Sequence, residues 1–267
     1  MGGDEAAADR DEVGVGSDDR VRGMATLHTD VEGPAGAPAL VCLHGGIGTG
    51  RYHWSRQVDG LAERFRVHLP DLPGHGRTPL PLGADYGPDL IAEAVEDVLD
   101  RFPAPVHVAG FSMGGHAALH VAARRPELFA SLTVVGVATA PHDGLAAWRE
   151  RFDPDALEAA YPAWTRALAR LHAEQDGGWR EVVRRDAGTG LHREVDLDGL
   201  EKLERPVLLV RGDRDPVVTP AQYAELRTRL ARSEELVVNY GGHDVQLTRH
   251  RIVQPALLDF LGRAADE

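Results

Sequence analysis

Short, almost wholly apolar runs recur along the chain, and longer segments with a helical spacing of apolar residues separate them. Runs of this kind are typical of strands that are buried on both faces of a sheet. They predict strands at residues 39–46, 105–110, 131–137, 206–212 and 235–239. Residues 66–76 predict a shorter strand that runs into a loop. Residues 21–33 partly alternate, which indicates a strand and the start of a hairpin.

Helices are predicted between these strands. Residues 88–102 place apolar side chains three or four positions apart with carboxylates between them, which is the pattern of an amphipathic helix. Residues 221–230 and 252–264 are also predicted to be helical. Strands that alternate with helices indicate an α/β fold, with a mostly parallel sheet that helices cover on both faces.

Residues 141–203 break this alternation, because no strand pattern occurs in them. A continuous helical stripe is predicted through Leu157, Tyr161, Trp164, Leu168 and Leu171. We interpret the segment as a helical insertion that is well placed to act as a lid. The predicted organisation is a disordered acidic tail (1–20), the first part of the core (21–140), a helical cap (141–203) and the second part of the core (204–267).

The net charge of −13 argues against a nucleic-acid partner, since phosphate binding needs a basic face. It also gives no reason to expect attraction to anionic membranes. The sequence has one cysteine and no apolar leader, so we expect a cytoplasmic protein, either a monomer or a homodimer. Lysine occurs once among the 29 basic residues, which is typical of a GC-rich bacterial genome. No zinc-type ligand spacing or phosphate loop occurs, so no metal and no cofactor are expected.

The segment GFSMG at residues 110–114 fits the pattern G-x-S-x-G, with a predicted strand before it and an alanine-rich helical segment after it. A sharp turn from strand to helix strains the serine backbone and brings neighbouring chain close, which leaves no room for Cβ atoms at the flanking glycines. The helix N-terminus would then favour developing negative charge near the hydroxyl. We predict Ser112 as a nucleophile; the alternative is a capping serine in a glycine-rich turn.

A serine hydroxyl is a poor nucleophile without a base. His243 follows the last predicted strand, in a loop at the carboxyl edge of the sheet where open α/β folds build their sites. Asp213 and Asp215 follow another predicted strand, and Pro216 fixes the turn after Asp215. The order Ser112, Asp215, His243 is the one expected for this type of triad. Asp215 is therefore the predicted acid, with Asp213 as the alternative.

Four motifs in this order resemble the α/β-hydrolase family over roughly residues 21–264: LHGGIG, DLPGHGRT, GFSMGG, and the pair GDRDPV and GGH. The resemblance implies a mostly parallel eight-stranded sheet, with the cap inserted after strand six. Dehalogenases and epoxide hydrolases of this fold have an aspartate where this chain has Ser112, so the resemblance points away from them.

The resemblance assigns Ser112 as nucleophile, Asp215 as acid and His243 as base. It places the oxyanion hole at the backbone N–H groups of Gly46 and Met113. Residues implied to be mainly structural are His44, Asp71, Gly74, Gly76 and Thr78, with an acid role for Asp71 as the alternative.

The predicted reaction is hydrolysis of a small, partly apolar carboxylic ester, lactone or thioester through an acyl-enzyme intermediate. Tyr161, Trp164 and His142 are the candidate pocket residues, although packing within the cap is the alternative for the two aromatic side chains. Two other functions stay open. A C–C bond hydrolase or lyase would use the same triad with polar groups beside it, for which His116, Arg77 and His142 are candidates. A non-catalytic ligand-binding protein could keep the triad without turnover.

Overall fold

One sheet of seven strands, in the order β1-β3-β2-β4-β5-β6-β7, organises the computed structural model, which describes residues 27–188 and 193–266. The strands are β1 (Thr29–Glu32), β2 (Ala39–Leu43), β3 (Arg66–Pro70), β4 (Val106–Phe111), β5 (Phe129–Val135), β6 (Val207–Gly212) and β7 (Ser233–Val238). Strand β1 is antiparallel to β3, and all other neighbours are parallel. The mostly parallel sheet predicted from the sequence is therefore confirmed.

The described residues hold seven strands where the family resemblance implied eight. The predicted strand at 21–33 is present only as β1, and residues 21–26 lie outside the described part of the chain. The tail predicted at 1–20 lies outside it as well.

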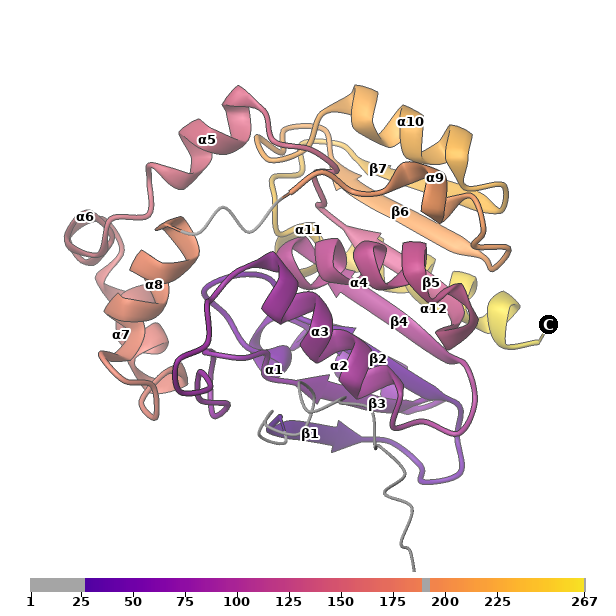
Figure 1. Ribbon diagram of the computed structural model, residues 1–267, viewed down its shortest axis with the longest axis horizontal. Coiled ribbons are helices and arrows are strands. Elements are labelled where there is room, and N and C mark those ends of the chain that lie inside the picture. The colour runs from indigo at the N-terminus through magenta and orange to yellow at the C-terminus, as the bar shows by residue number, and fades with distance from the viewer. Residues whose placement is uncertain (1–26, 189–192, 267) are drawn as a thin grey trace, which may run out of the picture.

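Helices cover both faces of the sheet (Figure 1). In the first half of the chain they are α1 (Gly50–His53), α2 (Val58–Ala62), α3 (Pro88–Leu99), α4 (Ser112–Arg124) and the 3-10 turn η1 (Pro126–Leu128). In the second half they are α9 (Leu197–Leu200), α10 (Pro220–Arg229), α11 (Val245–Thr248) and α12 (His250–Ala265). No helix in the described residues is long and apolar enough to cross a lipid bilayer.

Strand β2 shows how the apolar runs produce this layering. Val41 and Leu43 belong to the apolar cluster on one face, which includes side chains of α3, α4 and α10, whereas Leu40 and Cys42 belong to the cluster on the other face, which includes side chains of α2 and α12. All four side chains are fully buried, because successive residues of a strand point to opposite faces. Uniformly apolar strands are thus what a sheet covered on both sides requires.

Of the helices described between β5 and β6, Figure 1 shows all but α9 grouped beyond one end of the strands: α5 (Asp143–Arg149), α6 (Pro154–Ala160), α7 (Pro162–Leu171) and α8 (Gly178–Gly188). Side chains of α6, α7 and α8 form a separate apolar cluster that also includes Ile47, from the loop after β2. This contact places the helices over the carboxyl ends of the strands.

The prediction of one continuous helical stripe through this region is wrong. Helix α6 ends at Ala160, Tyr161 is not helical, with a φ of −135° and a ψ of 57°, and a new helix starts at Pro162. The ring of a proline disfavours helical geometry in the residue before it, so a break at this point is expected. Leu157 and Leu168 still pack in the same cluster, on either side of the break.

Candidate active site

Ser112 lies at the sharp turn between β4 and α4, and its φ is 47°, a value that residues other than glycine rarely adopt. A Cβ atom built on Gly110 would lie 2.4 Å from the Cα of Gly115. This contact is too short for any side chain, so the strand and the helix can approach only because both residues are glycine. The local sequence therefore dictates the strained turn that raises the serine above the sheet.

Three side chains from distant parts of the chain meet at this turn. His243 Nε2 lies 3.0 Å from Ser112 Oγ, and His243 Nδ1 lies 2.9 Å from Asp215 Oδ2. Because a carboxylate only accepts, Nδ1 carries the proton that it donates to Asp215, and Nε2 is left to accept from the Ser112 hydroxyl. The side chain of Asp215 is fully buried and also accepts from the backbone N–H of Val217 at 2.8 Å. The geometry can pass a proton from Ser112 to His243.

The alternatives for the acid lie elsewhere. Asp213 is exposed, and its backbone N–H donates to the carbonyl of Val238. Asp71 is buried against the backbone N–H groups of Gly50 and Arg77. Neither carboxylate has a hydrogen bond to His243 among the contacts of the described residues.

Gly46, in the loop after β2, lines the same cavity as Ser112 and Met113. Within the described part of the chain, neither the N–H of Gly46 nor that of Met113 has a hydrogen-bond partner. His44 holds this loop: its Nδ1–H donates to the carbonyl of Gly45 at 2.8 Å, and its Nε2 accepts from Leu72 N–H at 2.8 Å. Burial keeps the pKa of His44 well below its ordinary value, so the ring stays neutral.

A cavity of about 840 Å³ opens onto Ser112 and His243. Tyr161 and Trp164 line it, as do the apolar side chains Leu145, Trp148, Phe152 and Leu157 from the segment between β5 and β6. The Trp148 ring lies edge-on to His243, with centroids 5.9 Å apart. The helices over the sheet thus supply much of the wall of this cavity.

His142 does not line this cavity, contrary to the prediction from the sequence. Its Nδ1 accepts the backbone N–H of Leu145 and caps α5, while its Nε2–H donates to the carbonyl of Val217. The other two polar candidates are also outside the wall. His116 Nε2 bonds to the carbonyl of Arg193, and Arg77 pairs with Asp30.

Two polar features of the wall were not predicted from the sequence. The first is Asp186 on α8, a carboxylate that is only 6% exposed and lies beside the Gly46 loop. The second is a set of three arginines, which are Arg149, Arg151 and Arg214. No motif marks either feature, because both depend on how the helices dock on the sheet.

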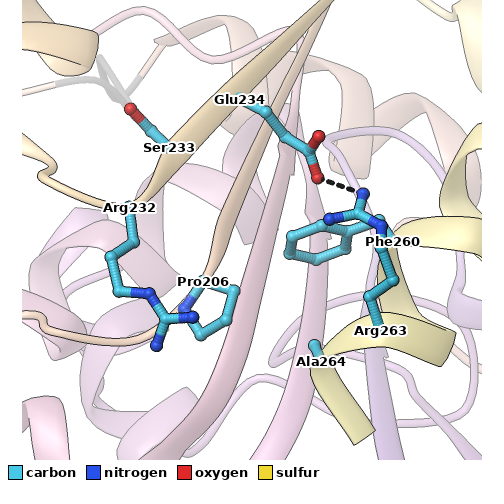
Figure 2. Close-up of a pocket in the computed structure, with 7 residues that line it drawn as sticks. All are labelled: Pro206, Arg232, Ser233, Glu234, Phe260, Arg263 and Ala264. Carbon is cyan, nitrogen blue, oxygen red and sulfur yellow. Dashed lines mark hydrogen bonds and ion pairs between the residues drawn. The ribbon is translucent and has the colours of Figure 1, made fainter. Parts of the chain in front are cut away.

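A second hollow, of about 270 Å³, lies at the opposite ends of β6 and β7 (Figure 2). Its wall carries the ion pair between Glu234 and Arg263, with 2.6 Å between the charged atoms. Ser233 is present, but its hydroxyl donates to the carbonyl of Leu230 and no histidine lines this hollow. It therefore holds no counterpart of the serine and histidine pair.

The fold and this arrangement of side chains define a class of protein, and comparison with known families agrees. The chain belongs to the alpha/beta hydrolase family, whose sequence model matches residues 40–254.

Its relatives include esterases. The chain is 32% identical over 241 residues to a pimeloyl-[acyl-carrier protein] methyl ester esterase of Aeromonas hydrophila, a match that covers 81% of this chain and 92% of the relative. It is 31% identical to the esterase Rv0045c of Mycobacterium tuberculosis, with 80% of each chain covered. The solved 2-hydroxy-6-oxo-6-phenylhexa-2,4-dienoate hydrolase of Rhodococcus sp. strain RHA1 has the same fold, with a TM-score of 0.74, 23% identity and coverage of 90% and 96%.

Proposed function

We propose that this protein is a serine hydrolase that cleaves a small carboxylic ester, lactone or thioester through an acyl-enzyme intermediate. One observation carries the proposal: the unbroken chain of hydrogen bonds from Ser112 through His243 to Asp215 opens onto a cavity of about 840 Å³. The esterase relatives support the same chemistry.

In the proposed mechanism, His243 Nε2 takes the hydroxyl proton as Ser112 Oγ attacks the acyl carbonyl. Asp215 holds the imidazole in the required tautomer and stabilises the imidazolium. The N–H groups of Gly46 and Met113 receive the negative charge that develops on the carbonyl oxygen, and each such donor is typically worth about 3–4 kcal/mol in the transition state. His243 then protonates the leaving group and activates the water that hydrolyses the acyl-enzyme.

We further propose that residues 141–203 act as the cap. Their helices provide Tyr161 and Trp164 on one side of the cavity and Leu145 and Trp148 next to His243. An apolar wall of this kind excludes water from the acyl chain and favours a substrate with an apolar part.

The three arginines give this pocket a charge preference. None of them is paired with a carboxylate in the described residues. Arg149 donates to the carbonyl of Ala187 at 3.0 Å, Arg151 lies 5.7 Å from the centre of the Trp148 ring, and Arg214 lies over an exposed tyrosine ring. The wall also contains the carboxylate residue Asp244, besides the hydrogen-bonded Asp186. Three guanidinium groups favour a substrate that carries negative charge away from the scissile bond.

The test is turnover of chromogenic short-chain esters, lactones and thioesters in ¹⁸O-labelled water, by the native protein and by Ser112→Ala. The proposal predicts an acid product that contains one label, and no turnover by the variant. Turnover of a vinylogous diketone but of no ester would favour C–C bond cleavage instead. Tight ligand binding without any turnover would favour a binding protein.

A further inference from the structure

A buried carboxylate on α8 contacts the loop that carries the proposed oxyanion donor Gly46. Asp186 Oδ2 accepts the backbone N–H of Ile47 at 2.6 Å and lies 3.0 Å from His75 Nε2. Its other oxygen, Oδ1, accepts the hydroxyl of Tyr86 at 2.5 Å. A Cβ atom at Gly46 would lie 3.0 Å from Oδ2, so the carboxylate is packed directly against this loop. Both oxygens are therefore used by groups of the core.

These donors favour the ionised carboxylate. Burial by itself raises the pKa of Asp186, but His75 and the hydrogen bonds from His75, Tyr86 and Ile47 outweigh burial and lower the pKa below its ordinary value. The other ring nitrogen of His75, Nδ1, lies 3.1 Å from the carbonyl of Pro73. The His75 ring therefore has an oxygen next to each of its nitrogens, the carbonyl of Pro73 on one side and the carboxylate of Asp186 on the other.

Ile47, which donates its backbone N–H to Asp186, has an unfavourable backbone conformation. Its φ is 62°, in the left-handed region that is unfavourable for a β-branched side chain. A conformation of this kind persists only where the surroundings hold it. Both backbone groups of Ile47 are held from the helices between β5 and β6: its N–H by Asp186, and its carbonyl by His172 Nε2 at 3.3 Å. The turn fixes the peptide unit that follows Gly46.

The second proposed oxyanion donor is connected to the same carboxylate. The Tyr86 hydroxyl that donates to Asp186 lies 3.7 Å from the sulfur of Met113. Tyr86 is only 7% exposed, so its ring cannot move away without disrupting the core. Asp186 therefore contacts the Gly46 loop directly and the Met113 turn through Tyr86.

We propose that Asp186 is a positioning residue that sets the distance and direction between the N–H groups of Gly46 and Met113. The inference rests on the proposed function, since it concerns the oxyanion hole of that reaction. Because Asp186 belongs to α8, the oxyanion hole is complete only when α8 is docked on the Gly46 loop. The cap segment then takes part in transition-state stabilisation as well as in shaping the pocket.

The test compares Asp186→Ala, Asp186→Asn and Tyr86→Phe with the native protein. Asp71→Asn is the matched control, because Asp71 is also buried and also holds two backbone N–H groups, but contacts neither Gly46 nor Met113. Each variant is assayed for kcat and KM with p-nitrophenyl butyrate. Each is also titrated with a trifluoromethyl ketone, which forms an anionic adduct with the serine, and with the matching methyl ketone, which serves as a neutral ground-state analogue. Denaturant unfolding reports the stability of each variant separately.

Loss of one oxyanion donor typically costs about 100- to 1,000-fold in kcat, so misplacement of a donor is expected to cost about 10- to 100-fold in Asp186→Ala. KM and methyl ketone affinity should change by less than about threefold, whereas trifluoromethyl ketone affinity should fall in parallel with kcat. Asp186→Asn is expected to recover part of the loss, since its amide oxygen can still accept from Ile47.

Folded variants that lose stability but keep kcat and the preference for the trifluoromethyl ketone would overturn the proposal. If Asp186→Ala does not fold, Asp186→Asn and Tyr86→Phe provide the test. The measured quantity is then the ratio of trifluoromethyl ketone affinity to methyl ketone affinity in each of these two variants. A failure of the proposed function itself would be seen in the native protein, as an absence of ester turnover and of any serine adduct.

Discussion

His243 Nε2 lies 3.0 Å from Ser112 Oγ, although 131 residues separate them in the chain. The contact arises because both residues follow the carboxyl ends of strands in one parallel sheet, Ser112 after β4 and His243 after β7. The sheet thus delivers a hydroxyl and an imidazole to the same edge. The strained turn at Ser112 then raises the hydroxyl to the height of the ring.

Asp215 is expected to act through the orientation and charge of His243. Asp215→Asn keeps the size of the side chain, but its amide can donate to Nδ1 and so favours the wrong imidazole tautomer. We predict a loss of about 10³- to 10⁴-fold in kcat with little change in KM, measured with p-nitrophenyl butyrate. Asp213→Asn, two residues away and exposed, should stay within about twofold of the native protein. The opposite ranking would make Asp213 the acid.

The arginines of the cavity are expected to select for charge. Mono-p-nitrophenyl glutarate and p-nitrophenyl valerate have acyl chains of equal length, but only the first carries a distal carboxylate. We predict that Arg149→Gln lowers kcat/KM for the glutarate at least threefold and leaves the valerate nearly unchanged. Added salt should weaken the preference of the native protein for the glutarate.

Arg166→Gln is the control for this prediction, since Arg166 is exposed on α7 and does not line the cavity. An equal effect of both substitutions would show that the preference comes from overall charge. No preference for the glutarate at all would contradict the charge assignment.

Replacement of Gly114 by alanine is expected to lower the stability of the protein. A Cβ atom there would lie 2.6 Å from the carbonyl oxygen of His44 and 2.7 Å from the Cβ of Leu43. Alanine favours helices over glycine by about 1 kcal/mol, yet overpacking of this kind costs about 1–3 kcal/mol or more, so Gly114→Ala should be destabilising. Urea unfolding would measure the change. Gly36→Ala, with open space around its Cβ position, should change stability by less than about 0.5 kcal/mol.

The buried histidines are expected to make folding stability depend on pH above the pH range in which carboxylates titrate. Burial lowers the pKa of His116 to about 4 and that of His172 to about 4. An unfolded histidine takes up its proton near pH 6.5, so between about pH 6.5 and 4 the unfolded state binds more protons than the folded state. Stability is therefore full above pH 6.5 and falls as the pH is lowered, by up to about 1.4 kcal/mol per pH unit for each such histidine.

Urea unfolding at pH 7.5, 6.0 and 5.0 measures how the free energy of unfolding changes with pH. His116→Gln should lower this slope by up to about 1.4 kcal/mol per pH unit, because one histidine that binds a proton on unfolding is removed. The contribution of Asp186 has the same sign but a lower range. Its pKa is lowered in the folded state, so its stabilisation is lost only as the pH falls below the ordinary carboxylate range. A free energy of unfolding that does not change between pH 7.5 and 5.0 would contradict the assignment of buried neutral histidines.

The sequence was sufficient for the parts of this protein that depend on local pattern. Apolar runs of β2 and β4 and the glycines around Ser112 have a physical meaning that does not depend on the rest of the chain. The sequence also contains the signal for the break at Pro162, because proline disfavours a helical residue before it. The regular spacing of apolar residues predicted a continuous helix instead, and that prediction was wrong.

Asp186 was beyond this kind of prediction. Its contacts with Ile47 and His75 span 139 and 111 residues, and they exist only because α8 docks on the loop after β2. In the sequence it is one of many carboxylates in a charged segment, without a motif around it. His142 shows the converse: its residue type suited a pocket, but its ring is used to cap α5 and to hold Val217.

The proposed mechanism requires Ser112 to be an activated nucleophile. The most direct measurement is the intact mass of the protein after treatment with a fluorophosphonate probe, for the native chain and for Ser112→Ala. The mechanism predicts a single adduct on the native chain and none on the variant. A folded native protein that gains no adduct, or a variant that is labelled equally, would contradict it.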